Sequence, residues 1–401
     1  MKITKMSLVA ALLVGSSAFA IENTKVSGDA KLYYGTSDTG TSSLFDRASS
    51  AGQAAATLSI STDLAGGVSA GTKVTALTTL GLEGQLVGSV WEAPNALTDT
   101  FIVNDLWIAA TAGKTTAKVG RMALDTPLVF TETWSIVENT FESAVLINTD
   151  VPHTTIVAAY VGGSNGDLVT KNGFNNVINP EAANSTFSQF YKGAYAVGAI
   201  NNSWAPLTAQ AWYYDASSTA KAYWLQADLA MEGFLVGAQF TGTDLTQLGL
   251  ADKGTAFALM AGYEMKDMFT AKVSYSQTSD NKTDFNGVGT VGANLAGSGQ
   301  SKLYTEAWWN YGKVTRANTS SFHVAVEGSV AGIDLGAYGT ISQQKKSVNA
   351  GIAADDNMNE GTLTASKSMG PVDVTAAYIL DNNQNSTDYE NTLQAYLTYN
   401  F

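Results

Sequence analysis

Few residues in this chain could perform covalent chemistry. Gly162-Gly163-Ser164-Asn165-Gly166 fits the G-x-S-x-G pattern, in which a serine nucleophile sits on a tight strand-to-helix turn. Such a serine needs a histidine base, and the sequence holds only His153 and His323. The residues that follow Gly166 show no helical period. We therefore expect a glycine-rich loop tip here and no catalytic residues.

Phosphate and metal motifs are equally incomplete. Gly113-Lys114-Thr115 lacks the first glycine of a phosphate-binding loop, so it indicates a turn. The run from Asp355 to Asn359 begins like a calcium loop, but Glu360 takes the place of the turn glycine and Ser366 that of the closing acid. With no cysteine and two histidines, a transition-metal site is improbable. The sequence predicts no cofactor and no metal, and leaves open only an isolated calcium ion at 355–359.

One segment, residues 122–139, combines acidity with apolar character. It carries Asp125, Glu132 and Glu138 and no lysine or arginine. Its larger apolar residues would be poorly placed on a solvated loop: Leu128, Val129, Phe130, Trp134 and Ile136. Folding inward against a wall explains both features, and carboxylates in a narrow channel attract cations. We predict a cation-preferring pore constriction; the alternative is a solvated loop face.

Arg121 stands directly before this segment. Strict alternation along its strand aims the side chain at lipid, where a charge is costly. We expect the pleat to break there, so that Arg121 opposes the three acids across the constriction.

Alternation with a period of two recurs through the chain and predicts strands with two unlike faces. In the segment from Thr392 to Phe401, polar residues alternate with an apolar stripe that ends on Tyr399 and Phe401. A terminal aromatic strand of this kind resembles the signal that the outer-membrane assembly machinery reads. The polar faces of the strands carry the residues expected to line a lumen: Asp29, Lys31, Asp228, Lys272, His323 and Glu327.

Tight turns and long polar loops connect these strands alternately. This asymmetry is typical of a transmembrane β-barrel, whose strand number is even when both ends lie on one side. Assigning 280–320 to a single long outer loop restores the alternation and predicts eighteen strands. Residues 303–311 would then form a short helix or lid within that loop. The last strand would pair with the strand that starts near Thr24.

Composition supports export and excludes other classes. Residues 1–20 combine two lysines, an apolar run and an Ala-x-Ala end, the pattern of a cleaved signal peptide, which leaves 21–401 as a single barrel domain. Cleavage removes two lysines and no acids, so the net charge goes from −13 to −15 and disfavours nucleic-acid binding. No apolar run outside the leader approaches the ~20 residues of a membrane helix.

The run from Val119 to Leu128, with Glu132-Thr133-Trp134 and Asn139-Thr140-Phe141-Glu142, resembles the third-loop region of the Opr-type outer-membrane porins of Campylobacter-like bacteria. These are related to the Campylobacter major porin and to the substrate-specific porins of Pseudomonas. The resemblance implies an eighteen-stranded barrel, usually a homotrimer, with an inward-folded third loop. Where the family usually has Gln after the Gly-Arg pair, this chain has the apolar Met122, so the resemblance implies no polar substrate contact at that position.

The sequence thus predicts an all-β porin in the outer membrane of a Gram-negative bacterium. Its partners would be outer-membrane lipid, small hydrophilic solutes and cations, and the assembly machinery. A structural or adhesive barrel is the main alternative, and single-channel conductance would separate the two. A barrel enzyme and an exported β-sandwich fit less well, because no Ser-His or Asp-His constellation is present and the loops alternate in length.

Overall fold

The computed structural model describes residues 22–38, 42–78, 80, 100–133, 136–165, 169–172, 175–178, 188–216, 220–244, 253–280, 291–295, 299–382 and 389–401. The leader expected at 1–20 and Trp134 lie outside these residues. Within them, no helix is long and apolar enough to cross a membrane.

Strands dominate the described chain. They are β1 (Glu22–Ser37), β2 (Ser50–Ala65), β3 (Val68–Thr78), β4 (Thr100–Ala112), β5 (Thr115–Met122), β6 (Phe141–Asn148), β7 (Thr154–Ser164), β8 (Val169–Asn172), β9 (Asn175–Ile178), β10 (Ser188–Asn201), β11 (Leu207–Ala216), β12 (Ala220–Met231), β13 (Phe234–Asp244), β14 (Lys253–Met265), β15 (Phe269–Thr278), β16 (Thr319–Val330), β17 (Ile333–Gln344), β18 (Asp356–Met369), β19 (Val372–Asn382) and β20 (Glu390–Asn400). Two 3-10 helices, η1 (Arg47–Ser49) and η4 (Lys313–Thr315), lie in loops.

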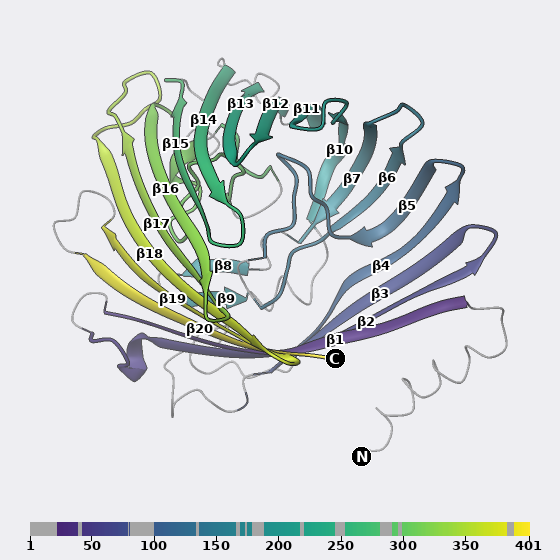
Figure 1. The fold of residues 1–401 in the computed structure, drawn as a ribbon, viewed down its shortest axis with the longest axis horizontal. Helices are drawn as coiled ribbons and strands as arrows, with labels where there is room; N and C mark the ends of the chain where they lie inside the picture. Colours follow the sequence, from purple (N-terminus) through teal and green to yellow (C-terminus); the bar gives the residue numbers. More distant parts are fainter. Residues whose placement is uncertain are drawn as a thin grey trace.

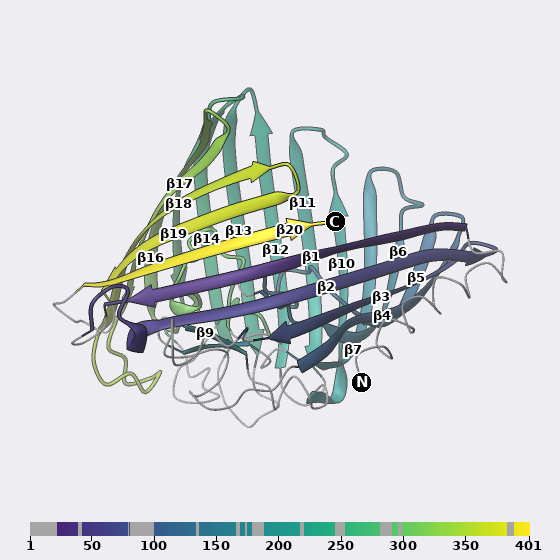
Figure 2. The ribbon, with the colours of Figure 1, turned by 90° about the horizontal axis from the view of Figure 1, so that it is seen from below.

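Eighteen of the strands form one closed antiparallel barrel. Each pairs with its neighbour in the chain, β7 pairs with β10, and β20 pairs with β1 from Asp29↔Asn400 to Ser37↔Thr392. Figures 1 and 2 show the strands surrounding a central space. β8 and β9 form a separate hairpin. The predicted fold class, strand number and closing pair are confirmed.

The two faces of each strand differ as their alternation predicts. On β20, Thr392 and Gln394 are buried, whereas Leu397 and Tyr399 are exposed on the outer surface. On β16, His323 and Ala325 are buried, whereas Phe322 and Val326 point outward and are exposed. Since exposed apolar residues cover the outside of the barrel, its outer surface suits a lipid environment.

Tight turns join the strands at one end of the barrel, at 66–67, 113–114, 149–153, 202–206, 232–233, 266–268, 331–332 and 370–371. Several turn residues have positive φ, among them His153 and Ala331 at 55° each, a conformation that tight turns require. The longer loops leave from the other end, so the predicted asymmetry is present.

Within the described part of the chain, two of these loops fold into the barrel. The third loop, residues 123–140, joins β5 to β6, and the seventh loop, residues 279–318, joins β15 to β16. A single long loop at 280–320 is therefore confirmed. Of the two alternatives expected at 303–311, a short helix or a lid, the helix is absent. The N–H groups of Trp309, Asn310 and Gly312 bond to the carboxylates of Glu360 and Glu306 instead of to helical carbonyls, and the chain there runs as irregular turns.

Candidate functional site

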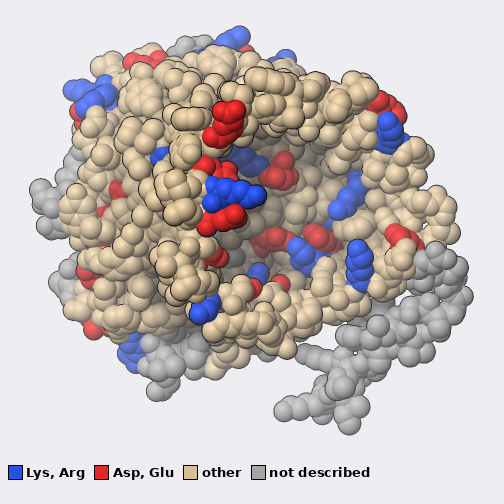
Figure 3. All heavy atoms as spheres, viewed as in Figure 1, with Lys and Arg blue, Asp and Glu red and all other residues tan. Residues whose placement is uncertain are grey.

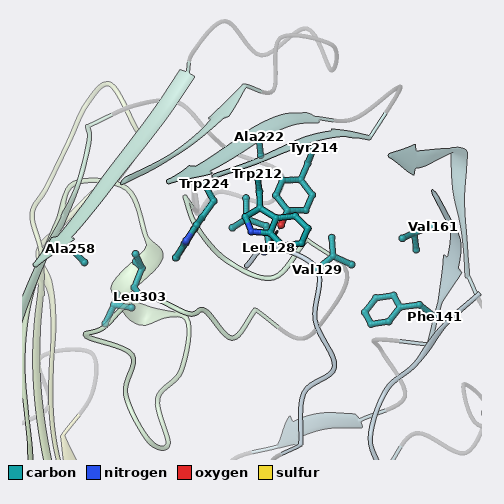
Figure 4. Close-up of a cluster of buried hydrophobic side chains, with 11 residues drawn as sticks. Leu128, Val129, Phe141, Val161, Trp212, Tyr214, Ala222, Trp224, Ala258 and Leu303 are labelled. Carbon is teal, nitrogen blue, oxygen red and sulfur yellow. Dashed lines mark hydrogen bonds between the residues drawn. The ribbon is translucent and has the colours of Figure 1, made fainter. Parts of the chain in front are cut away.

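The third loop packs against the inner wall of the barrel through its apolar residues. Leu128 is fully buried and Val129 nearly so, in a cluster with Trp212 of β11, Trp224 of β12 and Leu303 of the seventh loop (Figure 4). Packing such side chains removes them from water, which favours docking by about 1.5–3 kcal/mol for each fully buried residue. The inward-folded third loop predicted from the sequence is confirmed.

Asn294 ties the seventh loop to the third. Its side-chain amide donates to the carbonyl oxygen of Phe130 over 2.8 Å and accepts from the Phe130 N–H over 3.3 Å. It also donates to Glu132 over 3.0 Å. The N–H of Leu295 donates to the Leu128 carbonyl over 2.8 Å. The two loops therefore form a single obstruction inside the barrel.

Glu360 of β18 anchors the seventh loop to the opposite part of the wall. Its buried carboxylate accepts hydrogen bonds from the N–H of Trp309 (2.9 Å), the N–H of Asn310 (2.7 Å) and the side chain of Asn310 (3.0 Å). Asn310 also donates to Asp381 over 2.8 Å. One carboxylate thus accepts from two buried backbone donors.

The three acids predicted to form a constriction all lie in the third loop, and each has a partner. Asp125 forms an ion pair with Lys302 of the seventh loop, and Glu138 forms one with Lys73 of β3. Glu132 is buried and accepts from Asn294. Because lysines offset two of the three charges, this group attracts cations less strongly than three unpaired carboxylates would.

The structure corrects the expectation for Arg121. The residue pairs with Leu106 and Glu142 across β4 and β5 and across β5 and β6, and Leu106 is exposed on the outer surface. Its guanidinium donates to the Val103 carbonyl and to Glu142, each over 2.9 Å. The side chain of Arg121 stays on the outer face of the barrel. The ion pair with Glu142 compensates its positive charge there. Arg121 therefore pairs with an acid outside the predicted constriction.

The residues expected to line the lumen fall on inner faces of the strands. Asp29 and Lys31 of β1 lie 3.6 Å apart. Asp228 accepts from the hydroxyl of Tyr304 in the seventh loop, and Glu327 accepts from Tyr338 over 2.7 Å. These contacts place Asp29, Asp228 and Glu327 beside polar partners on the inner wall.

The remaining two predicted lumen residues sit on neighbouring strands. His323 of β16 bonds the Thr340 hydroxyl over 2.9 Å, and Lys272 of β15 pairs with Ala325 beside it. Figure 3 shows acidic and basic side chains together inside the hollow of the barrel. Charges of both signs therefore face the interior.

Sequence reasoning missed Lys73, Lys302 and Glu360. Lys73 shares its strand face with the buried Thr75 and Leu77, so the alternation that identified the other lumen residues could have identified it. Lys302 lies in an irregular loop, and in the sequence Glu360 stands out only at the turn position of an incomplete calcium loop. No local pattern indicates their partners.

Two cavities meet at Trp308. The first lies inside the barrel, and the second extends to the rim of the barrel, where the outward-facing Phe269 and Leu335 also line it. The upper cavity, about 580 Å³, lies between the two inner loops and the wall; the lower cavity, about 680 Å³, lies near the tight turns at 266–268 and 331–332. Trp308, Tyr338 and Thr375 line both. The two cavities therefore meet at these three side chains.

The catalytic and metal motifs do not assemble. Ser164 ends β7 and His153 precedes its first residue, so a strand of eleven residues, about 35 Å long, separates them. Among the described residues, no group of three or more His, Asp or Glu side chains could hold a metal ion.

Glu306 organises the seventh loop from within. Its carboxylate accepts from the N–H groups of Ser301 (2.7 Å), Ala307 (3.1 Å) and Gly312 (2.9 Å). Burial nevertheless raises the pKa of Glu306 to about 7, since desolvation of the charged form outweighs these bonds.

We expect the docked loop to weaken as this carboxyl ionises. A folded pKa above the unfolded value means that the stabilisation is complete below about pH 4.5 and is lost as the pH rises through about 7. The full effect is on the order of 3 kcal/mol. The thermal unfolding midpoint in detergent should be lower at pH 8 than at pH 5, by more in the natural chain than in Glu306→Gln. Equal shifts in both proteins would contradict this assignment.

Comparison with known proteins identifies the fold. No family model and no curated protein matches the chain. The outer-membrane protein OpdK of Pseudomonas aeruginosa superposes with a TM-score of 0.71 at 12% identity, covering 95% of this chain and 99% of its own. This is the fold of OpdK. OccK9 (OpdG) gives 0.71 at 12% identity over 96% and 99%, and OccK8 (OprE) gives 0.68 at 14% over 96% and 99%, both from the same organism. One OpdK structure contains vanillate.

Proposed function

We propose that the protein is an outer-membrane porin, a passive diffusion channel for small hydrophilic solutes and ions that prefers cations. The main support is a closed barrel whose interior is narrowed, but not filled, by two docked loops. The fold shared with OpdK and its Occ relatives is consistent with this location. Solutes would move down their gradients, so no bond is made or broken.

The cation preference has its best support in the lower cavity. Its lining includes four acids, Glu264, Asp267, Glu327 and Asp334, and none of the described residues that line it is lysine or arginine. Acidic groups on low-dielectric walls raise the local concentration of cations and lower that of anions. In this proposal the lower cavity contributes more to selectivity than the third loop, whose acids pair with lysines.

Reversal potentials across a KCl gradient in planar bilayers test the charge preference. The natural protein should favour K⁺ over Cl⁻, and the isosteric double variant Glu327→Gln/Asp334→Asn should lower the permeability ratio about two- to threefold, because each removed charge is worth about 1 kcal/mol or less in wet surroundings. Glu232→Gln removes one negative charge from an exposed turn and should leave the ratio unchanged. Anion selectivity in the natural protein would overturn the proposal.

The other expectations stay part of this proposal. They are cleavage after residue 20, assembly as a homotrimer, and contact of the barrel with outer-membrane lipid and with the assembly machinery through Tyr399 and Phe401. Asp29, Lys31, Asp228, Lys272 and His323 would set the remaining charge pattern along the lumen.

A further inference from the structure

Aromatic side chains border much of the upper cavity. Five rings border it: Trp308, Trp309 and Tyr311 from the seventh loop, Tyr338 from β17 and Tyr396 from β20. Side-chain amides and hydroxyls form another part of the wall: Thr133, Gln300, Thr375, Gln394 and Thr398. Lys31, Glu306 and His323 also line it. Its volume of about 580 Å³ is in the range of small-molecule sites. The lining therefore combines apolar planes with neutral hydrogen-bonding groups.

The aromatic ring of Trp308 lines this cavity, and its neighbours hold it in place. Its ring stacks on Tyr338 with centroids 5.2 Å apart and planes at 24°, and His323 stacks on Tyr338 at 6.5 Å. The indole is still 42% exposed. The next residue, Trp309, is bonded through its N–H to Glu360, so the backbone beside the ring is fixed. A solute that stacks on Trp308 would pay little to order the site.

The two charged groups at the cavity are already occupied. The ammonium of Lys31 lies 3.6 Å from Asp29, and the Glu306 carboxylate accepts from three N–H groups of its own loop. A charged solute would lose hydration here without gaining an unpaired opposite charge among the described lining residues. A neutral solute with several hydroxyls could exchange its waters for the amides and hydroxyls of the wall.

We propose that the upper cavity is a binding subsite for a neutral, polyhydroxylated ring, that is, a monosaccharide or simple glycoside, with Trp308 as its stacking platform. The apolar C–H face of such a ring packs on an aromatic plane, and its hydroxyls reach Gln300, Gln394 and the threonines. This inference rests on the proposed channel function. Trp308 also lines the lower cavity. A sugar ring that is stacked on Trp308 in the upper cavity therefore obstructs the passage between the two cavities.

The test is the ion current of single channels in planar bilayers while a neutral probe is added. Methyl β-D-glucopyranoside should reduce the current of the natural protein with saturation, whereas sorbitol, an open-chain polyol, should give only a linear fall from viscosity. Trp308→Ala should weaken the saturable reduction at least fivefold. Trp308→Phe should retain part of it, and Trp204→Ala, which removes an exposed tryptophan from the turn at 202–206, should retain all of it.

Saturable reduction by benzoate but not by the glucoside would overturn the proposal, and so would full retention in Trp308→Ala. If Trp308→Ala does not assemble, an unchanged response in Trp308→Phe together with Tyr338→Leu overturns it as well. Absence of any current in the natural protein would instead overturn the channel function. Calorimetric titration of the glucoside into detergent-purified protein then tests binding at the subsite independently of any current. An absence of binding heat would overturn the proposed subsite.

Discussion

Replacing Glu360 with Ala should release the seventh loop from the wall and raise both the conductance and the current noise of the open channel. The carboxylate is the partner of two buried backbone N–H groups, those of Trp309 and Asn310. Leaving buried donors without a partner costs about 1–3 kcal/mol each, so docking of this part of the loop should weaken by about 2–6 kcal/mol. The barrel wall should persist, since the ladder hydrogen bonds of β18 come from its backbone.

Glu360→Gln provides the matched control for this prediction. Its carbonyl oxygen can accept one of the two backbone bonds, whereas its NH₂ group cannot accept the other, so the conductance should lie between those of the natural protein and Glu360→Ala. Single-channel recording at fixed salt measures all three. If Glu360→Ala conducted like the natural protein, with no added noise, the anchoring role of Glu360 would be refuted.

The barrel could be predicted from the sequence because its information is local. A strand that faces lipid on one side and a wet interior on the other must alternate, and each tight turn needs only a few residues of suitable conformation. The stripe on β20 and the turn residue His153 both show this. The alternation of tight turns and long loops along the whole chain assigns 280–320 to one loop. The sequence of that segment alone does not lead to this assignment.

The interior could be predicted only in part, because its contacts join residues far apart in the chain. Asp125 pairs with Lys302, 177 positions away, and Glu132 bonds Asn294, 162 positions away. The acidic residues of the third loop can be recognised in its own sequence. The lysines that pair with them lie elsewhere in the chain, so the pairing cannot be recognised there. The same limit applies to the irregular path of 303–311, where backbone N–H groups bond to the carboxylates of Glu306 and of the distant Glu360.

Arg121 illustrates a different failure. Alternation correctly aimed the side chain outward, and the cost of a charge in lipid was used to argue that the pleat must break. The pleat continues because Glu142 stands directly opposite on β6 and the Val103 carbonyl accepts a second bond. Gly120 allows the close approach of β4, since a Cβ there would lie 2.2 Å from the Leu106 carbonyl oxygen at a φ of +127°. The ion pair with Glu142 thus lowers the cost of placing a charge on the outer face, and Arg121 can follow the alternation of its strand.

Deleting Phe401 should reduce the amount of barrel inserted in cells far more than it changes the conductance of the channels that do insert. Phe401 exchanges two backbone hydrogen bonds with Gly28 of β1, of 2.8 and 2.9 Å, where β20 meets β1. Its exposed ring lies over Gly28, where any Cβ would come within 2.5 Å of it. Two hydrogen bonds contribute about 1–3 kcal/mol, a small fraction of what eighteen paired strands provide.

A large loss of inserted protein would therefore reflect recognition during assembly and not stability of the finished barrel. Heat-modifiable migration of outer-membrane fractions on gels measures the folded amount, and bilayer recording measures the conductance. Phe401→Tyr keeps an aromatic ring and should insert normally. Phe322→Ala removes an outward-facing phenylalanine from β16 and should also insert normally, because it leaves the β1–β20 seam intact. Normal insertion of the protein lacking Phe401 would show that the aromatic end of β20 is not the assembly signal.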